Sequence, residues 1–156
     1  MGGLALSLEA SNLKVRINNA TKHHRRGWID LTCTFKNVRD QPLKLGTIFV
    51  EHMLHLHLES AQGKWVFSMH KEMDPPTYIT LKPGEQWIHR TKAYGVARTG
   101  TRWQSEDPKP GRYSFKAMLD IHTPRPEQDE WMGKVYSNEA VLTVLPPDPK
   151  AVEAFR

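Results

Sequence analysis

The stretch Ile29-Asp30-Leu31-Thr32-Cys33-Thr34-Phe35-Lys36 decides the fold class of this chain. Apolar side chains occupy every odd position of the stretch, and polar side chains occupy every even position. Because successive side chains of a strand point to opposite faces, this alternation predicts a half-buried β-strand. Cys33 falls on the buried face of that strand, where a lone thiol acts as a small apolar filler.

The same two-residue period recurs along the chain and predicts further strands. The expected strands cover residues 4–9, 13–17, 43–50, 52–59, 64–69, 85–92, 112–121 and 140–145. The segments 43–50 and 52–59 form either two strands or one long, bent strand. Turns that contain proline and glycine separate nearly all of them, and no segment shows a sustained 3.6-residue apolar period. About seven to nine short strands in a chain without helices predict an all-β fold, a single antiparallel β-sandwich.

Length and composition predict one domain. The chain has 156 residues, of which 38% are hydrophobic and 25% are charged. With this balance the chain as a whole is not an intrinsically disordered segment. No apolar run approaches the roughly 20 residues that a membrane-spanning helix needs. We expect the domain to cover residues 1–145 and a proline-rich tail to cover 146–156. No signal peptide is visible, so the compartment stays open between the cytoplasm and, if a leader has been removed, export.

Five motifs resemble those of a known family. They are Thr34-Phe35-Lys36-Asn37, Pro42-Leu43, Leu81-Lys82-Pro83-Gly84-Glu85, Lys109-Pro110-Gly111-Arg112-Tyr113 and the run from Trp131 to Val141. Together they resemble bacterial immunoglobulin-like domains, and the nearest family is the intracellular proteinase inhibitor domain. The resemblance implies an immunoglobulin-like sandwich in which the Tyr113 hydroxyl bonds back to a loop, as in a tyrosine corner. It also implies protease inhibition, although no inhibitory loop can be matched residue by residue.

The long connection at 94–110 predicts a contact surface. Arginine, tryptophan and tyrosine are enriched at interface hot spots, so we expect Arg98, Arg102 and Trp103 to anchor a partner, with Tyr94 in support. The alternative is an ordered flap that packs Trp103 onto the chain's own core. No nucleophile elbow, phosphate-binding loop or zinc-protease motif is present, so we expect no catalysis. The leading hypothesis is a non-catalytic binding or assembly module whose partner is another protein.

Metal binding is the second hypothesis. In the segment 52–59, leucines alternate with polar residues, so His55 and His57 point to the same side of a strand. With help from Met69 or His70, they would form a soft donor set suited to copper, or to zinc. The simpler alternative is that both histidines are solvated on the outer face of a sheet, and no other cofactor is expected. The chain has one cysteine, so it offers no Cys-based metal cage.

Nucleic-acid binding is the third hypothesis. The formal net charge of +5 favours acidic partners, and the one dense basic run lies just before Trp28. Lys22, Arg25 and Arg26 would contact phosphates while Trp28 stacks on a base, which predicts weak and salt-sensitive binding. The alternative is a basic hairpin loop whose tryptophan seals the end of the sandwich. Nucleic acid therefore ranks behind protein as the expected partner.

Overall fold

The computed structural model describes residues 2–10, 14–16, 29–47, 50, 53–69, 78–98, 109–122 and 130–146. Within them eleven strands follow in the order β1 (Leu4–Ala10), β2 (Lys14–Arg16), β3 (Ile29–Asn37), β4 (Leu43–Leu45), β5 (Leu54–Ser60), β6 (Gly63–Met69), β7 (Ile79–Leu81), β8 (Gln86–Arg98), β9 (Gly111–Ile121), β10 (Gly133–Tyr136) and β11 (Ala140–Leu145). The all-β prediction is confirmed. In this part of the chain, no helix is long and apolar enough to cross a membrane.

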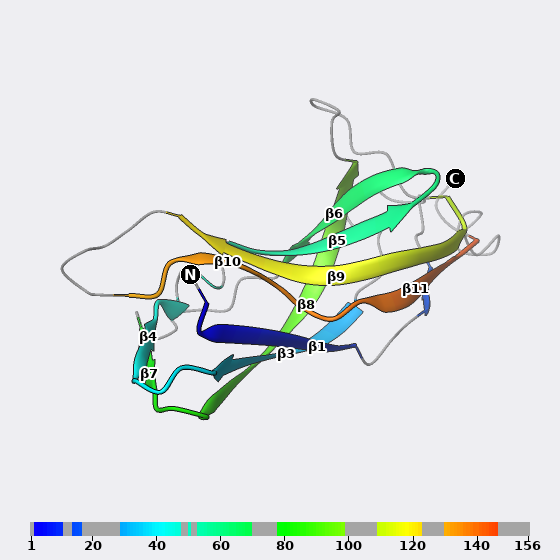
Figure 1. Cartoon of the computed structure of the whole chain (residues 1–156). Helices are drawn as coiled ribbons and strands as arrows, with labels where there is room; N and C mark the ends of the chain where they lie inside the picture. The colour runs from blue at the N-terminus through cyan, green and yellow to red at the C-terminus, as the bar shows by residue number, and fades with distance from the viewer. Residues whose placement is uncertain are drawn as a thin grey trace.

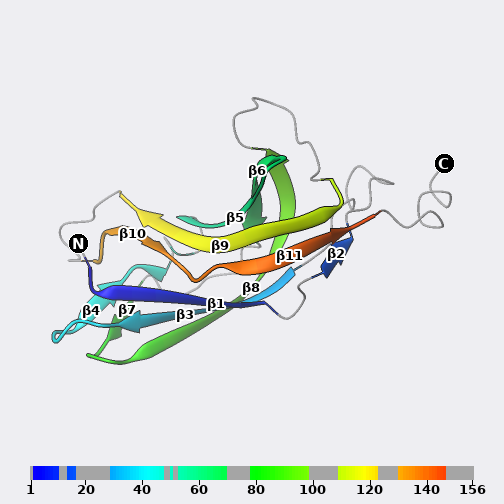
Figure 2. The ribbon, with the colours of Figure 1, turned by 45° about the vertical axis from the view of Figure 1, so that its right-hand side comes forward.

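Two sheets contain these strands. Nine strands form one sheet in the order β1-β3-β8-β6-β5-β9-β11-β2, with β10 also pairing with β9, and β4 and β7 form a second sheet. The large sheet folds over itself, so that β1, β3 and the start of β8 lie across from β5, β9, β10 and β11 (Figure 1, Figure 2). Among the described pairings only that of β2 with β11 is parallel.

Strand β8 passes from one layer to the other because its two halves pair with different strands. Residues 86–93 pair with β3, and residues 93–98 pair with β6. The register of the second pairing shifts between Phe67 and Ser68, which leaves Gly95 as the extra residue of a β-bulge. A bulge bends its strand and increases the local twist. Figure 1 accordingly shows β8 rising from its pairing with β3 toward β6.

The core lies where the alternating apolar faces of the two layers meet. The largest fully buried side chains are those of Tyr113, Phe35, Phe115, Leu43, Leu45, Leu56, Leu58, Leu119, Leu142 and Val50. In β3 the burial follows the predicted alternation, with Leu31, Cys33 and Phe35 all buried. At about 25 cal/mol per Å² of apolar surface removed from water, such an interface is the main favourable term in folding.

The strand predicted at 43–50 is wrong in extent. β4 ends at Leu45, and the backbone is helical at Thr47 and Val50, where the Val50 N–H donates to the Gly46 carbonyl at 3.3 Å. The partner strand β7 pairs with only three residues of β4, so the chain beyond Leu45 has no ladder to extend. Strand β5 consequently begins at Leu54 rather than at residue 52. The short strand β7 was not predicted, because three residues show no clear period. The run from Trp131 to Val141, which the family resemblance indicated as a single last strand, contains β10 and the start of β11.

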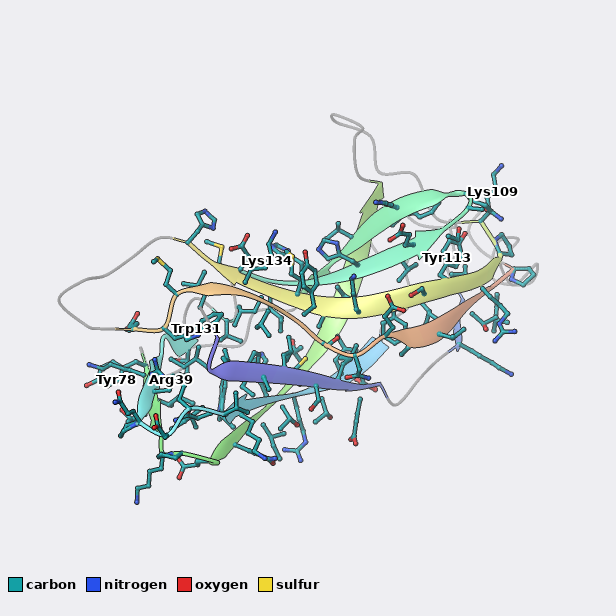
Figure 3. The ribbon with its side chains drawn as sticks, viewed as in Figure 1. Arg39, Tyr78, Lys109, Tyr113, Trp131 and Lys134 are labelled. Atoms are coloured by element: carbon teal, nitrogen blue, oxygen red, sulfur yellow. The ribbon has the colours of Figure 1, made fainter. Side chains whose placement is uncertain are left out.

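Two side chains bond strand ends to their loops. The Tyr113 hydroxyl donates to the Lys109 carbonyl at 2.6 Å, which is the bond to a loop that the sequence predicted, and Figure 3 shows the two residues at one end of the sandwich. At the end of β3, the buried Asn37 amide donates to the carbonyls of Gln41 and Leu81 at 2.8 and 2.9 Å. Both side chains therefore satisfy backbone groups that the strand ladders leave unpaired.

Candidate binding surface

The strongest candidate site in the described part of the chain is the outward side of β5, β9 and β10. We call it the cationic face, and it consists of His55, His57, Lys116, Lys134 and Tyr136. The strand register gathers these residues, because Met118 of β9 opposes His55 on one side and Tyr136 on the other, while Lys116 opposes His57. Their inward neighbours Leu54, Leu56, Leu58, Ala117 and Leu119 are buried, so the sheet beneath the face is packed against the core.

The Tyr136 ring is the centre of the cationic face. The ring is 46% exposed, and the Nζ atoms of Lys116 and Lys134 lie 4.6 and 5.9 Å from its centroid. An ammonium group within about 6 Å of an aromatic centroid is attracted by the ring quadrupole. Lys134 is labelled in Figure 3, and the burial pattern of β10 alternates so that Lys134 and Tyr136 are its two exposed residues. The arrangement holds two positive charges beside one exposed aromatic ring.

The histidines of β5 add charge that depends on pH. Partial burial lowers the pKa of His57 from its usual value, and the positive charges of His55, Lys116 and Lys134 lower it further. Glu59 acts in the opposite direction but has a smaller effect on the pKa. The lowered pKa of His57 therefore reflects its burial first and the neighbouring positive charges second.

Carboxylates bound the cationic face at both ends. At one end Glu59 forms an ion pair with Lys64 of β6, with 3.7 Å between the charged atoms. At the other end Asp120 opposes Lys134 across the β9–β10 pairing and lies 3.7 Å from the His122 ring nitrogen. Glu59 opposes Ser114, and Asp120 lies six residues further along β9, so the positive region extends over roughly 20 Å of strand at about 3.4 Å per residue.

Of the four predicted metal ligands, the structure places the side chains of two. His55 and His57 share the outward side of β5, as the alternation predicted. Met69 is the last residue of β6 and pairs with Ala93, but its side chain and all of His70 lie outside the described residues. No group of three or more His, Cys, Asp or Glu side chains in the described part is placed to hold a metal ion. The lysines of the cationic face oppose a bound cation, because like charges repel.

The predicted partner-binding loop is shorter than expected. β8 continues to Arg98, so Tyr94 and Arg98 belong to a strand rather than to a loop, because β6 pairs with this part of the chain. Arg102 and Trp103 lie outside the described residues. The predicted nucleic-acid contacts, Lys22, Arg25, Arg26 and Trp28, also lie outside them.

Cys33 is held as a neutral thiol. Its side chain is 0% exposed between the layers, and burial raises its pKa to about 12. Since the thiolate is the reactive form of cysteine, this residue is inert as a nucleophile at neutral pH. Cys33 therefore acts as the apolar filler that the sequence predicted.

Sequence reasoning missed Lys116, Lys134 and Tyr136 as site residues. Lys134 and Tyr136 flank Val135 in an alternating pattern, which could have indicated a short strand with an exposed side. No sequence signal places that strand beside Lys116, because pairing between strands depends on the fold. The chain matches no protein-family model, and no curated protein matches its sequence.

Proposed function

We propose that this chain is a non-catalytic binding module that recognises another protein. The observation that carries the proposal is the half-exposed Tyr136 ring with the ammonium groups of Lys116 and Lys134 beside it. Tyrosine is enriched at the centres of protein interfaces and buries a large area for a small loss of side-chain entropy. Its position on a paired strand of the sheet, rather than on a loop, reduces the ordering cost of binding further.

The end loop stays a second predicted contact region in this proposal. Arg102 and Trp103 are its expected anchors, with Tyr94 and Arg98 at the end of the strand that leads into it. Protease inhibition is the special case that the family resemblance implies. An assay of purified serine proteases with and without the chain tests that case, and unchanged hydrolysis at saturating chain would contradict it.

A comparison of two exposed tyrosines tests the proposed function. Tyr78 is 41% exposed next to β7 and also has a lysine ammonium, that of Lys44, 4.1 Å from its ring centroid. Tyr136→Ser and Tyr78→Ser therefore remove the same kind of side chain from β10 and from the residue that precedes β7. We expect the partner captured by the wild type to bind Tyr78→Ser normally in calorimetry and to bind Tyr136→Ser at least about tenfold more weakly.

The loop variant completes this experiment. Arg102→Ala/Trp103→Ala should weaken the same partner if the end loop contributes to binding. Equal affinity of one purified partner for the wild type, Tyr136→Ser and the loop double variant would contradict the proposal. Circular dichroism of each variant, compared with that of the wild type, shows whether the sandwich is retained.

Metal and nucleic-acid binding remain the alternatives. The closeness of His55 and His57 on one side of β5 favours a metal test, in which Cu(II) or Zn(II) is titrated into the wild type and His55→Ala/His57→Ala. Saturable heat in the wild type alone would support a site, and background heat in both proteins would end the idea. Binding to labelled DNA or RNA at two salt concentrations tests the basic run before Trp28, and an affinity independent of salt would contradict it.

A further inference from the structure

We propose that the cationic face binds an acidic polypeptide segment, an extended stretch of the partner that carries several Asp or Glu residues. This inference rests on the proposed function and names the chemistry of the partner. Its basis is the gathering of two lysines, two histidines and one exposed tyrosine by three neighbouring strands that come from distant parts of the sequence.

The spacing of the cations suits carboxylates of an extended chain. Lys116 opposes His57 across the β5–β9 pairing, whereas Lys134 opposes Asp120, four residues further along β9. The Nζ atoms of Lys116 and Lys134 lie 4.6 and 5.9 Å from the Tyr136 ring centroid. Alternate side chains of an extended peptide project to one side about 6–7 Å apart. A peptide that runs along the strands can therefore place one carboxylate beside Lys116 and His57 and another, four residues further on, beside Lys134. Hydrogen bonds between charged partners are shorter and stronger than neutral ones.

The ends of the face favour a short peptide over a nucleic acid. The Glu59 and Asp120 carboxylates stand at the two ends, where the continuing phosphates of a nucleic acid would meet negative charge. The Tyr136 ring has the ammonium of Lys116 at 4.6 Å from its centroid, so that ammonium competes with a base for the ring face. A peptide needs neither a long positive track nor an open ring face.

His57 makes the proposed binding depend on pH. The groups that face His57 are His55 and Glu59 on its own strand, Lys116 on β9 and Lys134 on β10, with Lys64 of β6 paired to Glu59. A carboxylate bound among them favours the protonated imidazole of His57, so the affinity rises as the pH falls from about 8 to about 6. Below about pH 4.5 the carboxyl groups of the ligand become protonated and the affinity falls again.

The test uses a fluorescently labelled peptide of alternating Glu and Ala residues, titrated with the full chain and followed by anisotropy. The face variant is Lys116→Gln/Lys134→Gln. The matched control is Lys36→Gln/Lys82→Gln, which removes two exposed lysines outside the cationic face. We expect saturable binding by the wild type and the control, and binding about two- to fivefold weaker for each lysine removed from the face. Binding should also weaken with added salt and strengthen at about pH 6 relative to about pH 8.

Three outcomes would overturn the inference. They are the absence of saturable peptide binding by the wild type, an equal loss of affinity in the face and control variants, and tighter binding of a single-stranded oligonucleotide of equal charge through the same two lysines. The comparison of Tyr136→Ser with Tyr78→Ser distinguishes a failure of the acidic-peptide inference from a failure of the proposed function. If Tyr136→Ser loses the captured partner while the acidic peptide does not bind, the chain is a binding module whose partner is recognised by other chemistry.

Discussion

The side-chain amide of Asn138 bonds both backbone groups of Leu8. The Leu8 N–H donates to Asn138 Oδ1 at 2.8 Å, and Asn138 Nδ2 donates to the Leu8 carbonyl at 3.4 Å. Leu8 belongs to β1 in one layer, whereas Asn138 joins β10 to β11 in the other. One side chain therefore takes the place of a neighbouring strand at the edge of β1 and links the two layers there.

Replacement of Asn138 by alanine should loosen this link. Asn138→Ala removes two hydrogen bonds, each worth about 0.5–1.5 kcal/mol, so we expect the free energy of unfolding to fall by about 1–3 kcal/mol. Urea denaturation measures the change. Glu139→Ala is the control, because the adjacent Glu139 is also exposed. Equal midpoints for the two variants would show that the amide does not hold the layers together.

Substitution of Asn37 should destabilise the fold more than the small size of its side chain suggests. Its buried amide donates to the Gln41 and Leu81 carbonyls, and its Oδ1 accepts a bond from the Arg39 N–H at 2.9 Å. Asn37→Asp keeps the shape but loses both donors and turns a carboxylate toward two carbonyls. We expect a loss of at least about 3 kcal/mol in the free energy of unfolding, against less than about 0.5 kcal/mol for Asp40→Asn in the exposed turn.

The contribution of the Tyr113 hydrogen bond to stability can be measured by removing the hydroxyl oxygen of this side chain. Tyr113→Phe retains the buried ring and leaves the Lys109 carbonyl without the hydroxyl that donates to it at 2.6 Å. We expect the free energy of unfolding to fall by about 0.5–1.5 kcal/mol, with little change in the circular dichroism spectrum. A variant as stable as the wild type would show that water replaces the hydroxyl at no cost.

Cys33 should resist thiol reagents until the protein unfolds. Because burial raises its pKa to about 12, its thiolate is scarce at pH 8, and reaction with a disulfide reagent should be slow in the native protein and fast in guanidinium. The raised pKa contributes stability below the unfolded value of about 9, which is lost as the pH rises toward 12. Cys33→Ala should lose less stability than the wild type over that alkaline range, and parallel profiles would contradict this assignment.

His57 should make stability depend on mildly acidic pH. Its pKa is lowered in the folded protein, so its contribution is present above the unfolded pKa of about 6.5 and is lost as the pH falls through the folded value. We expect His57→Gln to flatten the fall in urea midpoint between about pH 7 and about pH 5. A Gln86→Asn control, at an exposed site without a titratable side chain, should leave that slope unchanged.

The alternation in the sequence was enough to predict most long strands and the inward side of each. Leu31, Cys33 and Phe35 are buried as their odd positions indicated, because a strand turns every second side chain to one face whatever its neighbours are. The bond from Tyr113 to a nearby loop residue was also predictable, since its partners are four positions apart in the chain and the contact is local. The strand predicted at 43–50 failed because its length depends on a partner, β7, that lies elsewhere in the chain.

The sequence by itself thus determined the fold class, the core positions and the outward placement of His55 and His57. Only the tertiary structure decided that Lys116, Lys134 and Tyr136 join those histidines on one face. Periodicity is a property of a single strand, whereas the identity of neighbouring strands follows from how two layers bury their apolar faces together. The bend of β8 at Gly95 was likewise decided by the tertiary structure, because a β-bulge exists only in relation to the strand with which the bulged strand pairs.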